Sequence, residues 1–363
     1  MNRSLLGDLL RENDLVGLMA GSVDNFAYMV GTRIMTQALI PERTAFAVAT
    51  RDGGMYVTVC NVEVKQVAPF VSQVRTYTEF EDVPHQVLAE QMLAAGIRGR
   101  VGYERRWIPA YILDDLEVAL EGKITLVPAD EVFDRLRAIK TPEEIAILEQ
   151  AARATSRAIR QSFTPGHETE LDVAKDLTAG IMLGGASEVP FMVLASGRRA
   201  LPGHPYPTGD RMQPGDAIRT DVGGRFGTYV SDLARTGVIG QAGPVLKKTY
   251  ATLAAIHGEI LGAVKPGMPA KSLIDRTAEL FKQANLPFSP HLVGHNLGIS
   301  AHEWPILNIY ETGRLQTGMV LCIEHGYATD TFKLHIENTG VLTESGLRLF
   351  SEDDCPWQEL LQL

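Results

Sequence analysis

The stretch IRTDVGGRFGTYVSDLARTGV, residues 218–238, holds two carboxylates, Asp221 and Asp232, eleven positions apart. Apolar and β-branched residues flank its centre, which contains Gly223, Gly224 and Gly227. This pattern predicts an antiparallel hairpin that turns at the glycines and directs one Asp from each strand at the same point. Two carboxylates that close repel each other unless a proton or a metal ion lies between them. The stretch therefore predicts part of a polar site that other segments complete.

A second stretch repeats this pattern further along the chain. MQPGDAIRTDVG (Met212–Gly223) parallels LQTGMVLCIEHG (Leu315–Gly326), and in each a glycine precedes an acidic residue by six positions. Arg-Thr-Gly-Val and Asn-Thr-Gly-Val then follow the second acid of each stretch. The repeat predicts a second hairpin, Met319–Val341, that carries Glu324 and Glu337. A duplicated domain with pseudo-twofold symmetry would bring four carboxylates to one centre.

Helix signals place the start of this domain near Lys140. Thr141 is an N-cap, Pro142 occupies the first helical position and Glu144 completes a capping box. Apolar residues at helical spacing then continue towards Thr164-Pro165-Gly166, and a second helix is predicted over 171–183. We expect a catalytic domain over residues 136–363 and a separate domain over residues 1–135.

The first 135 residues predict a mixed sheet with helices. The expected strands are 15–19, 45–49, 55–60 and 100–103, and the expected helices are 84–95 and 110–120. No residues here have metal-ligand spacing. We expect the cluster Glu104-Arg105-Arg106 to lie on a solvated surface or a subunit contact.

Composition narrows the classes of function. The 363 residues are 45% hydrophobic and 21% charged, which is typical of a globular protein, and the length favours two domains. A net charge of −10 argues against nucleic acid or an anionic membrane as the main partner. Three widely spaced cysteines imply no disulfide framework, and the N-terminal residues carry charges within their apolar pattern. We therefore expect a cytoplasmic protein with no signal peptide and no transmembrane segment.

Histidines are concentrated where four carboxylates would need a cation. Seven of the nine lie after residue 200, namely His204, His257, His291, His295, His302, His325 and His335. The tract from His291 to His302 contains three histidines and two glycines, a density that indicates a site. Carboxylates suit divalent ions such as Mn²⁺, Co²⁺, Fe²⁺ or Zn²⁺, and an imidazole shifts the preference towards transition metals.

Together these residues resemble the pita-bread metallohydrolases, in particular the creatinase, prolidase and aminopeptidase P branch. The resemblance rests on Asp221 and Asp232, on the Gly-His…His-Glu-x-Pro tract, and on Glu324 and Glu337 in C-terminal strands. It covers the whole chain, because residues 1–135 resemble the N-terminal domain of that branch. It implies an α/β (α+β) fold, with a pita-bread C-terminal domain of two pseudo-twofold halves and a smaller mixed-sheet N-terminal domain.

The resemblance also implies a dinuclear metal site and a set of catalytic residues. The implied ligands of two divalent ions (Mn, Co, Zn or Fe) are Asp221, Asp232, His295, Glu324 and Glu337, of which Asp232 and Glu337 bridge both ions. A water between the ions is the implied nucleophile. The implied catalytic residues are Glu324 as proton acceptor, His302 at the scissile group, and His204 and His291 as further histidines of this branch.

The activity implied is hydrolysis of C–N bonds in a small peptide or amide-like substrate, as in Xaa-Pro dipeptidases and aminopeptidases, by a homodimer. Two departures leave alternatives open. His335 stands where peptidases of this branch commonly have Arg, and Asn296 follows the metal histidine where Gly or a bulky residue is usual. The second hypothesis is a creatinase-like hydrolase or lyase of a small non-peptide metabolite. The third, a non-catalytic binding protein on the same scaffold, predicts eroded ligands, and none of the five is replaced.

Overall fold

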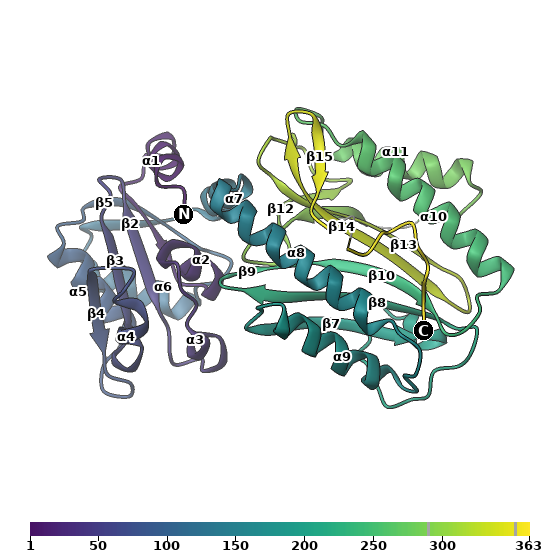
Figure 1. Ribbon diagram of the computed structural model, residues 1–363. Coiled ribbons are helices and arrows are strands. Elements are labelled where there is room, and N and C mark those ends of the chain that lie inside the picture. The colour runs from purple at the N-terminus through teal and green to yellow at the C-terminus, as the bar shows by residue number, and fades with distance from the viewer. Residues whose placement is uncertain (289–290, 352–353) are drawn as a thin grey trace. The chain divides into compact units, whose positions relative to one another are not determined.

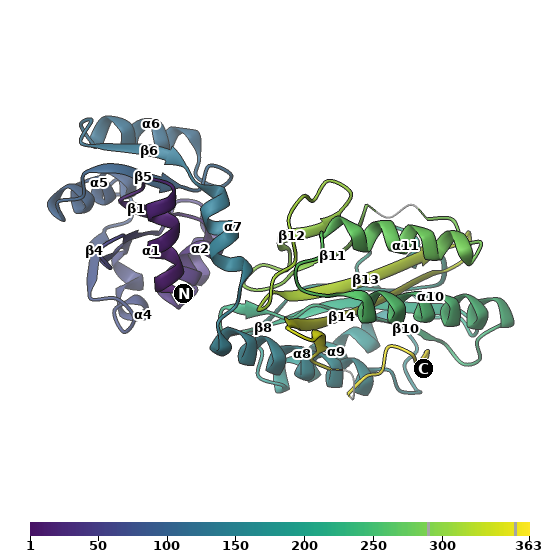
Figure 2. The same ribbon diagram turned by 90° about the horizontal axis from the view of Figure 1, so that it is seen from above.

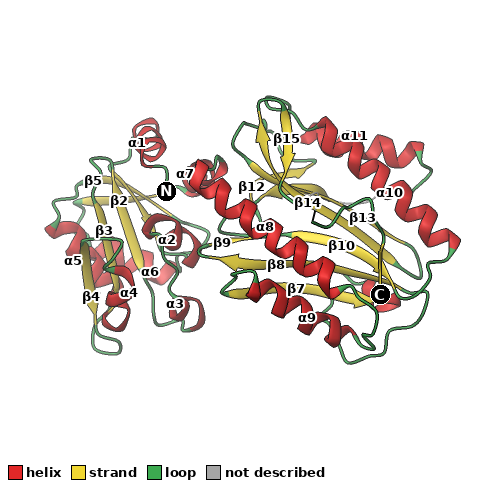
Figure 3. Cartoon of the chain, in the orientation of Figure 1, coloured by secondary structure: helices red, strands yellow, loops and turns green. Residues whose placement is uncertain are grey.

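The computed structural model describes residues 1–288, 291–351 and 354–363, which form two compact units, Met1–Arg137 and Ala138–Leu363 (Figure 1). In each unit the strands lie together and helices flank them (Figure 3). The division falls within the last turn of α7 (Asp130–Ala138), close to the boundary expected at residue 135. Within the described ranges, no helix is both long enough and apolar enough to cross a membrane.

The N-terminal unit is built on one mixed sheet in the order β4-β3-β2-β1-β5-β6. β1 pairs antiparallel with β2 and parallel with β5, so the sheet is mixed, as the sequence pattern predicts. The strands are β1 (Gly17–Ala20), β2 (Phe46–Thr50), β3 (Met55–Cys60), β4 (Gln73–Tyr77), β5 (Gly99–Tyr103) and β6 (Ile124–Pro128). The helices before α7 are α1 (Arg3–Glu12), α2 (Val23–Val30), α3 (Met35–Leu39), α4 (Val64–Val67), α5 (Pro84–Ala94) and α6 (Ala110–Ala119).

Glu104 is buried, so its predicted surface position is wrong. Only 1% of the residue is exposed, and its carboxylate accepts hydrogen bonds from the main-chain N–H groups of Gly21 and Ser22 and from the Asn25 side chain. These donors lie at the start of α2, where unpaired N–H groups and the helix dipole favour an anion. The charge pattern alone did not reveal this tertiary partner.

The C-terminal unit contains two sheets, in the orders β16-β10-β8-β7 and β12-β11-β13-β14-β15, with β9 paired to β8. Its strands are β7 (Glu188–Ser196), β8 (Ala217–Phe226), β9 (Tyr229–Val230), β10 (Leu233–Val238), β11 (Leu292–Asn296), β12 (Glu303–Asn308), β13 (Val320–Ala328), β14 (Lys333–Thr343), β15 (Gly346–Leu349) and β16 (Leu361–Gln362). Its helices are α8 (Pro142–Ser162), α9 (Glu170–Leu183), α10 (Pro244–Ala263) and α11 (Lys271–Gln283).

The element order repeats within this unit, in agreement with the internal repeat. Each half runs through a helix pair, a strand and a long hairpin: α8, α9, β7 and β8–β10 in the first, and α10, α11, β11 and β13–β14 in the second. α8 and α9 pack beside β8 and β7, and α10 and α11 pack beside β13 and β11 (Figures 1 and 2). α8 begins with the capping box predicted at Thr141 and Glu144.

The first hairpin differs from its predicted form in two respects. Gly227 alone of the three glycines lies in the turn, with φ of 61°, whereas Gly223 and Gly224 lie inside β8. A Cβ on Gly223 would lie 2.0 Å from the main-chain oxygen of Ser231, so glycine is required there by close backbone approach. Asp232 lies in the break between β9 and β10, and the residue opposite Asp221 is Ala234. In the second hairpin, by contrast, Glu324 lies directly opposite Glu337.

The two sheets meet where β10 runs beside β14, and side-chain hydroxyls join them there. Thr236 Oγ1 donates to the main-chain oxygen of His335 at 2.9 Å and accepts from its main-chain N–H at 2.8 Å. Thr339 Oγ1 donates to the main-chain oxygen of Asp232 at 2.6 Å. These bonds fix Asp232 on one sheet relative to Glu337 on the other.

Candidate metal centre

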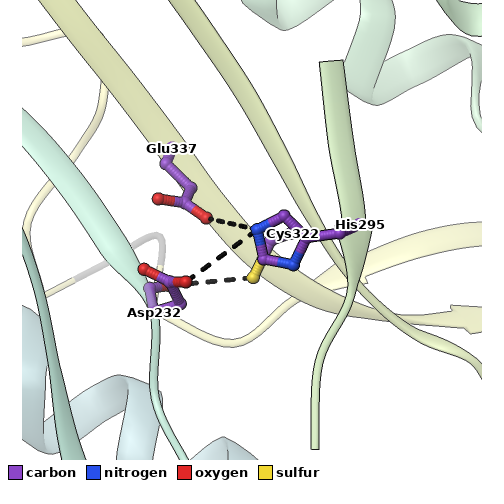
Figure 4. Close-up of side chains that lie close together, drawn as sticks. All are labelled: Asp232, His295, Cys322 and Glu337. Carbon is purple, nitrogen blue, oxygen red and sulfur yellow. Dashed lines mark hydrogen bonds and ion pairs between the residues drawn. The ribbon is translucent and has the colours of Figure 1, made fainter. Parts of the chain in front are cut away.

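The acidic residues of both hairpins converge on His295 of β11. His295 Nε2 lies 3.9 Å from Asp232 Oδ2, 3.8 Å from Glu324 Oε1 and 3.6 Å from Glu337 Oε1. The side chains of Asp232, His295 and Glu337 turn towards one another from three segments of the chain (Figure 4). The fifth residue, Asp221 on β8, is connected to this group through His335, whose Nδ1 lies 3.7 Å from Asp221 Oδ2. The structure thus brings together all five residues that the resemblance marked as ligands.

Electrostatics make this cluster unfavourable without a cation. Burial, followed by the charges of Glu337, Asp221 and Glu324, raises the pKa of Asp232 well above its usual range. Burial and neighbouring carboxylates raise the pKa of Glu337 in the same way. Asp232 Oδ1 and Glu337 Oε1 are buried and lack a hydrogen-bond partner among the described residues. Buried carboxylate oxygens without partners, next to an imidazole, are a donor set that fits divalent metal ions.

The pKa of Glu324 is shifted in the opposite direction from the pKa values of Asp232 and Glu337. Burial opposes its ionisation, but a hydrogen bond from His335 Nε2 at 3.1 Å and the charges of His335, His295 and His302 lower its pKa to about 2. Glu324 is also less buried, with 21% of its side chain exposed against 2% for Glu337. It therefore stays ionised at neutral pH and faces the cavity.

His295 is set up to offer Nε2 as a donor to a cation. Its Nδ1 lies 3.2 Å from the main-chain oxygen of Asn296, so the proton belongs on Nδ1 and the lone pair of Nε2 faces the carboxylates. Burial and the neighbouring His302 lower the pKa of His295 to about 4, which keeps the ring neutral. The ring of His302 stacks on it, with centroids 4.0 Å apart and planes 19° apart.

A hydrogen bond between two buried hydroxyls holds the segment that carries Asp232. Ser231 Oγ lies 2.7 Å from Thr155 Oγ1 on α8 and accepts from the main-chain N–H of Gly224 at 2.9 Å. Because both hydroxyls are fully buried, this bond ties the broken strand before β10 to α8.

A cavity of about 550 Å³ opens onto the cluster and contains the remaining predicted residues. His204, His291 and His302 all line it, and all three are exposed to solvent. The turn before His204 is held by the buried Arg219, whose guanidinium donates to the main-chain oxygens of Ala200 at 3.3 Å and Pro202 at 3.1 Å. Arg219 thus positions the His204 turn at the edge of the cavity.

Cys322 belongs to the cluster, and the sequence analysis missed it. One ligand atom from each of Asp232, His295, Cys322 and Glu337 lies within 4.8 Å of the others. Burial and the nearby Glu337 and Asp232 raise the pKa of the Cys322 thiol, and its Sγ lies 3.3 Å from Thr339 Oγ1. The available signal was its position two residues before Glu324, because residues i and i+2 of a strand share a face.

Two of the histidines that suggested a site lie behind it instead. His325 follows Glu324 on β13 and so points to the other face of that strand. Its Nδ1 lies 2.8 Å from His257 Nδ1 on α10, and His257 Nε2 lies 3.0 Å from Asn338 Oδ1. Burial lowers the pKa of both histidines, so they form a neutral hydrogen-bonded pair. This pair anchors the residues that follow Glu324 and Glu337.

Asn296 also has a structural role. Its Nδ2 donates to the main-chain oxygens of Ala138 at 3.0 Å and Trp304 at 2.8 Å, and its Oδ1 accepts from Lys140 Nζ at 2.8 Å. The side chain is fully buried and does not line the cavity. Asn296 therefore affects packing beneath the cluster. Of the two departures from the family pattern, only His335 bears on the choice between a peptide and a non-peptide substrate.

We expect the metal-free protein to lose stability as the pH rises from about 4 through neutrality. The folded-state pKa values of Asp232 and Glu337 lie above the usual values of about 4 for these groups, so the folded state binds more protons than the unfolded state. Their contribution is fully present below pH 4 and is lost as the pH passes the raised values. Glu324 acts in the opposite sense, because its stabilisation is lost as the pH falls towards 2.

The measurement is thermal unfolding of the chelated protein between pH 5 and 8. Glu337→Gln should flatten the decline, and addition of a divalent ion should reverse it, because a bound cation replaces the protons. A stability of the chelated protein that rises steadily over this range would contradict the assignment.

Comparison with known families agrees with this geometry. The model of metallopeptidase family M24 matches residues 146–344, more than half of the chain, and the creatinase/prolidase N-terminal domain model matches residues 3–139. The first match contains all five residues of the cluster predicted as ligands. These matches confirm the predicted family and the predicted combination of a pita-bread domain with a creatinase-like N-terminal domain.

Individual relatives span the chain to different extents. An uncharacterised peptidase of Bacillus subtilis, YqhT, is 31% identical over 95% of both chains. An Xaa-Pro dipeptidase of Pyrococcus furiosus is 32% identical over 62% of this chain, and the match spans 66% of that relative. Among solved structures, a dipeptidase from Pyrococcus horikoshii has a TM-score of 0.86 and 26% identity over the full length of both chains. The chain thus belongs to metallopeptidase family M24, and it is a metal-dependent peptidase with a creatinase/prolidase N-terminal domain.

Proposed function

We infer that this protein is a dinuclear hydrolase of Xaa-Pro dipeptides. The observation that carries the inference is the convergence of three carboxylates on His295, with a fourth, Asp221, connected to them through His335. The buried oxygens Asp232 Oδ1 and Glu337 Oε1 lack a hydrogen-bond partner among the described residues. Asp221, Asp232, His295, Glu324 and Glu337 would hold two divalent ions (Mn, Co, Zn or Fe), which would satisfy these oxygens and offset the repulsion. Such ions supply a Lewis acid and acidify a water.

The chain's own residues then bind the substrate and move protons. Glu324, ionised and open to the cavity, is the proposed proton acceptor. His302 presents its ring beside His295 and is proposed to donate a hydrogen bond to the oxygen that gains charge during cleavage. His204 and His291 at the cavity wall are proposed to contact the substrate main chain.

A cation in the cavity supports a dipeptide as substrate. Lys333 lies two residues before His335 on β14, so both face the cavity, and it has no ion pair with a described carboxylate. Its half-buried ammonium is available to bind the C-terminal carboxylate of a dipeptide. In this role Lys333 would replace the Arg that is usual at position 335. A cavity of this size holds a dipeptide, and the relatives named above include an Xaa-Pro dipeptidase and a dipeptidase.

A second candidate is favoured by His335 itself. A histidine cannot grip a carboxylate in the bidentate manner of Arg, so a small non-peptide amide without a carboxylate is the alternative substrate class. The homodimer implied by the resemblance and the cytoplasmic location expected from the composition also stay predictions.

The test is hydrolysis of Xaa-Pro dipeptides by protein reconstituted with Mn²⁺, Co²⁺ or Zn²⁺. We expect metal-dependent cleavage, and we expect Lys333→Met to raise KM by about 10–100-fold with little change in kcat, because one charged hydrogen bond to the carboxylate is lost. The matched control is the corresponding dipeptide amide, whose KM should not respond to this substitution.

Cleavage of non-peptide amides without Xaa-Pro cleavage would favour the second candidate. Absence of bound metal after reconstitution would support a binding protein instead.

A further inference from the structure

His335 lies inside the cluster, between two of the carboxylates. It stands two residues before Glu337 on β14, so both side chains project from the same face of that strand. Its side chain is 10% exposed. Nε2 lies 3.1 Å from Glu324 Oε2, and Nδ1 lies 3.7 Å from Asp221 Oδ2. The main chain of His335 is held on both sides by Thr236, so the ring projects from a fixed position.

The two ring nitrogens are in different situations. Nε2 is at hydrogen-bond distance from the ionised Glu324, which places the proton on Nε2 and leaves a lone pair on Nδ1. Nδ1 is buried and finds no hydrogen-bond partner in the described part of the chain. Asp221, His335 and Glu337 each offer a ligand atom, and these atoms lie within 4.8 Å of one another. Glu337 Oε1 likewise lacks a partner there.

This is the arrangement of a histidine that ligates a metal. Ligating imidazoles usually donate their second N–H to a carboxylate, which fixes the tautomer and makes the free nitrogen more basic. Glu324 supplies that carboxylate, and the unpartnered Nδ1 faces Asp221. A purely structural histidine would be expected to use both nitrogens in hydrogen bonds, as His257 does with His325 and Asn338.

We propose that His335 is a sixth metal ligand, which binds the ion on the Asp221 side through Nδ1. The proposal rests on the dinuclear site proposed above. It gives each ion one imidazole, His295 for one and His335 for the other. An Arg at this position cannot bind a cation, so the substitution changes the metal site as well as the substrate pocket. Nitrogen ligation at both positions favours Zn²⁺, Co²⁺ or Fe²⁺ over Mn²⁺.

The test counts ligating imidazoles in the protein loaded with Co²⁺. In proton NMR, each imidazole bound to paramagnetic Co²⁺ gives one strongly shifted N–H signal that disappears in D₂O. We expect two such signals in the wild-type protein. His335→Asn should remove one and His295→Asn the other, whereas His302→Asn, which alters a cavity histidine outside the ligand set, should keep both.

Metal titration provides a second readout. His335→Asn and His335→Arg should weaken binding of one of the two ions by at least about 10–100-fold, the loss caused by removing even an outer partner of a ligand. Two bound ions with a single shifted N–H signal in the wild-type protein would overturn the role of His335 and leave the proposed function standing. Failure to bind Co²⁺ at all would overturn both.

Discussion

Asp232→Asn is expected to abolish metal binding and peptidase activity and, at the same time, to make the metal-free protein more stable. Burial, followed by the charges of Glu337, Asp221 and Glu324, raises the pKa of Asp232. An amide carries no charge, so the substitution removes repulsion from the metal-free cluster. It also removes a proposed metal ligand, so the loss of metal affinity should exceed the roughly 10–100-fold effect of removing an outer partner.

The variant should lose metal and activity but gain stability in the metal-free form, so the two measurements are expected to change in opposite directions. Metal content after reconstitution and cleavage of a dipeptide should both fall to background, whereas the unfolding temperature of the chelated variant should rise above that of the chelated wild type. Metal should stabilise the wild type alone, by about 2.7 kcal/mol at a free concentration near 100 times Kd. Asp330→Asn, at an exposed position in the turn of the second hairpin, is the matched control and should change neither measurement.

An Asp232→Asn protein that keeps two ions and full activity would contradict the dinuclear model. A variant that loses metal but is also less stable than the chelated wild type would show that Asp232 has a structural partner, and the electrostatic account of the cluster would be wrong.

Lys140→Ala is expected to lower the free energy of unfolding of the catalytic unit by about 3–5 kcal/mol, the usual result of leaving a buried charge without its partner. Lys140 Nζ lies 3.1 Å from Glu303 Oε2, and the two side chains are 1% and 4% exposed. Glu303 also accepts from the main-chain N–H of Ile299 at 2.8 Å. Removal of the ammonium leaves the Glu303 charge inside the protein next to His302.

Chemical denaturation of the metal-loaded protein provides the measurement. The matched control is Lys271→Ala, which breaks an exposed pair with Asp275 and should cost about 0–1 kcal/mol. The double variant Lys140→Met with Glu303→Gln should recover much of the loss, because neither side chain then carries a charge. A cost of Lys140→Ala equal to that of Lys271→Ala would mean that Glu303 is solvated or protonated.

The sequence revealed the site because its residues follow local patterns. Acid spacing in the two hairpins predicts four converging carboxylates, the histidine tract indicates a site, and the family resemblance adds His295 as a ligand. The Thr141–Glu144 capping box forms as predicted. These signals act over a few residues of one helix or strand, so they can be read from the chain directly.

The features that the sequence analysis missed depend on contacts between distant segments. Glu104 is buried because the N–H groups at the start of α2 donate hydrogen bonds to its carboxylate. Gly223 was taken for a turn residue, yet it is required by the close approach of Ser231. Each depends on which segments pack together, and a single sequence does not specify that packing.

The division of the ligands between two hairpins also affects when the site can exist during synthesis. Asp221 and Asp232 leave the ribosome with the first half, long before Glu324 and Glu337, and neither half holds a complete set of donors. The last ligand strand, β14, docks beside β10 through Thr236 and Thr339, and this docking assembles the charge cluster. Binding of the proposed ions is therefore expected to be a late step that depends on contacts between distant parts of the chain, and it would stabilise only those molecules in which both halves have folded.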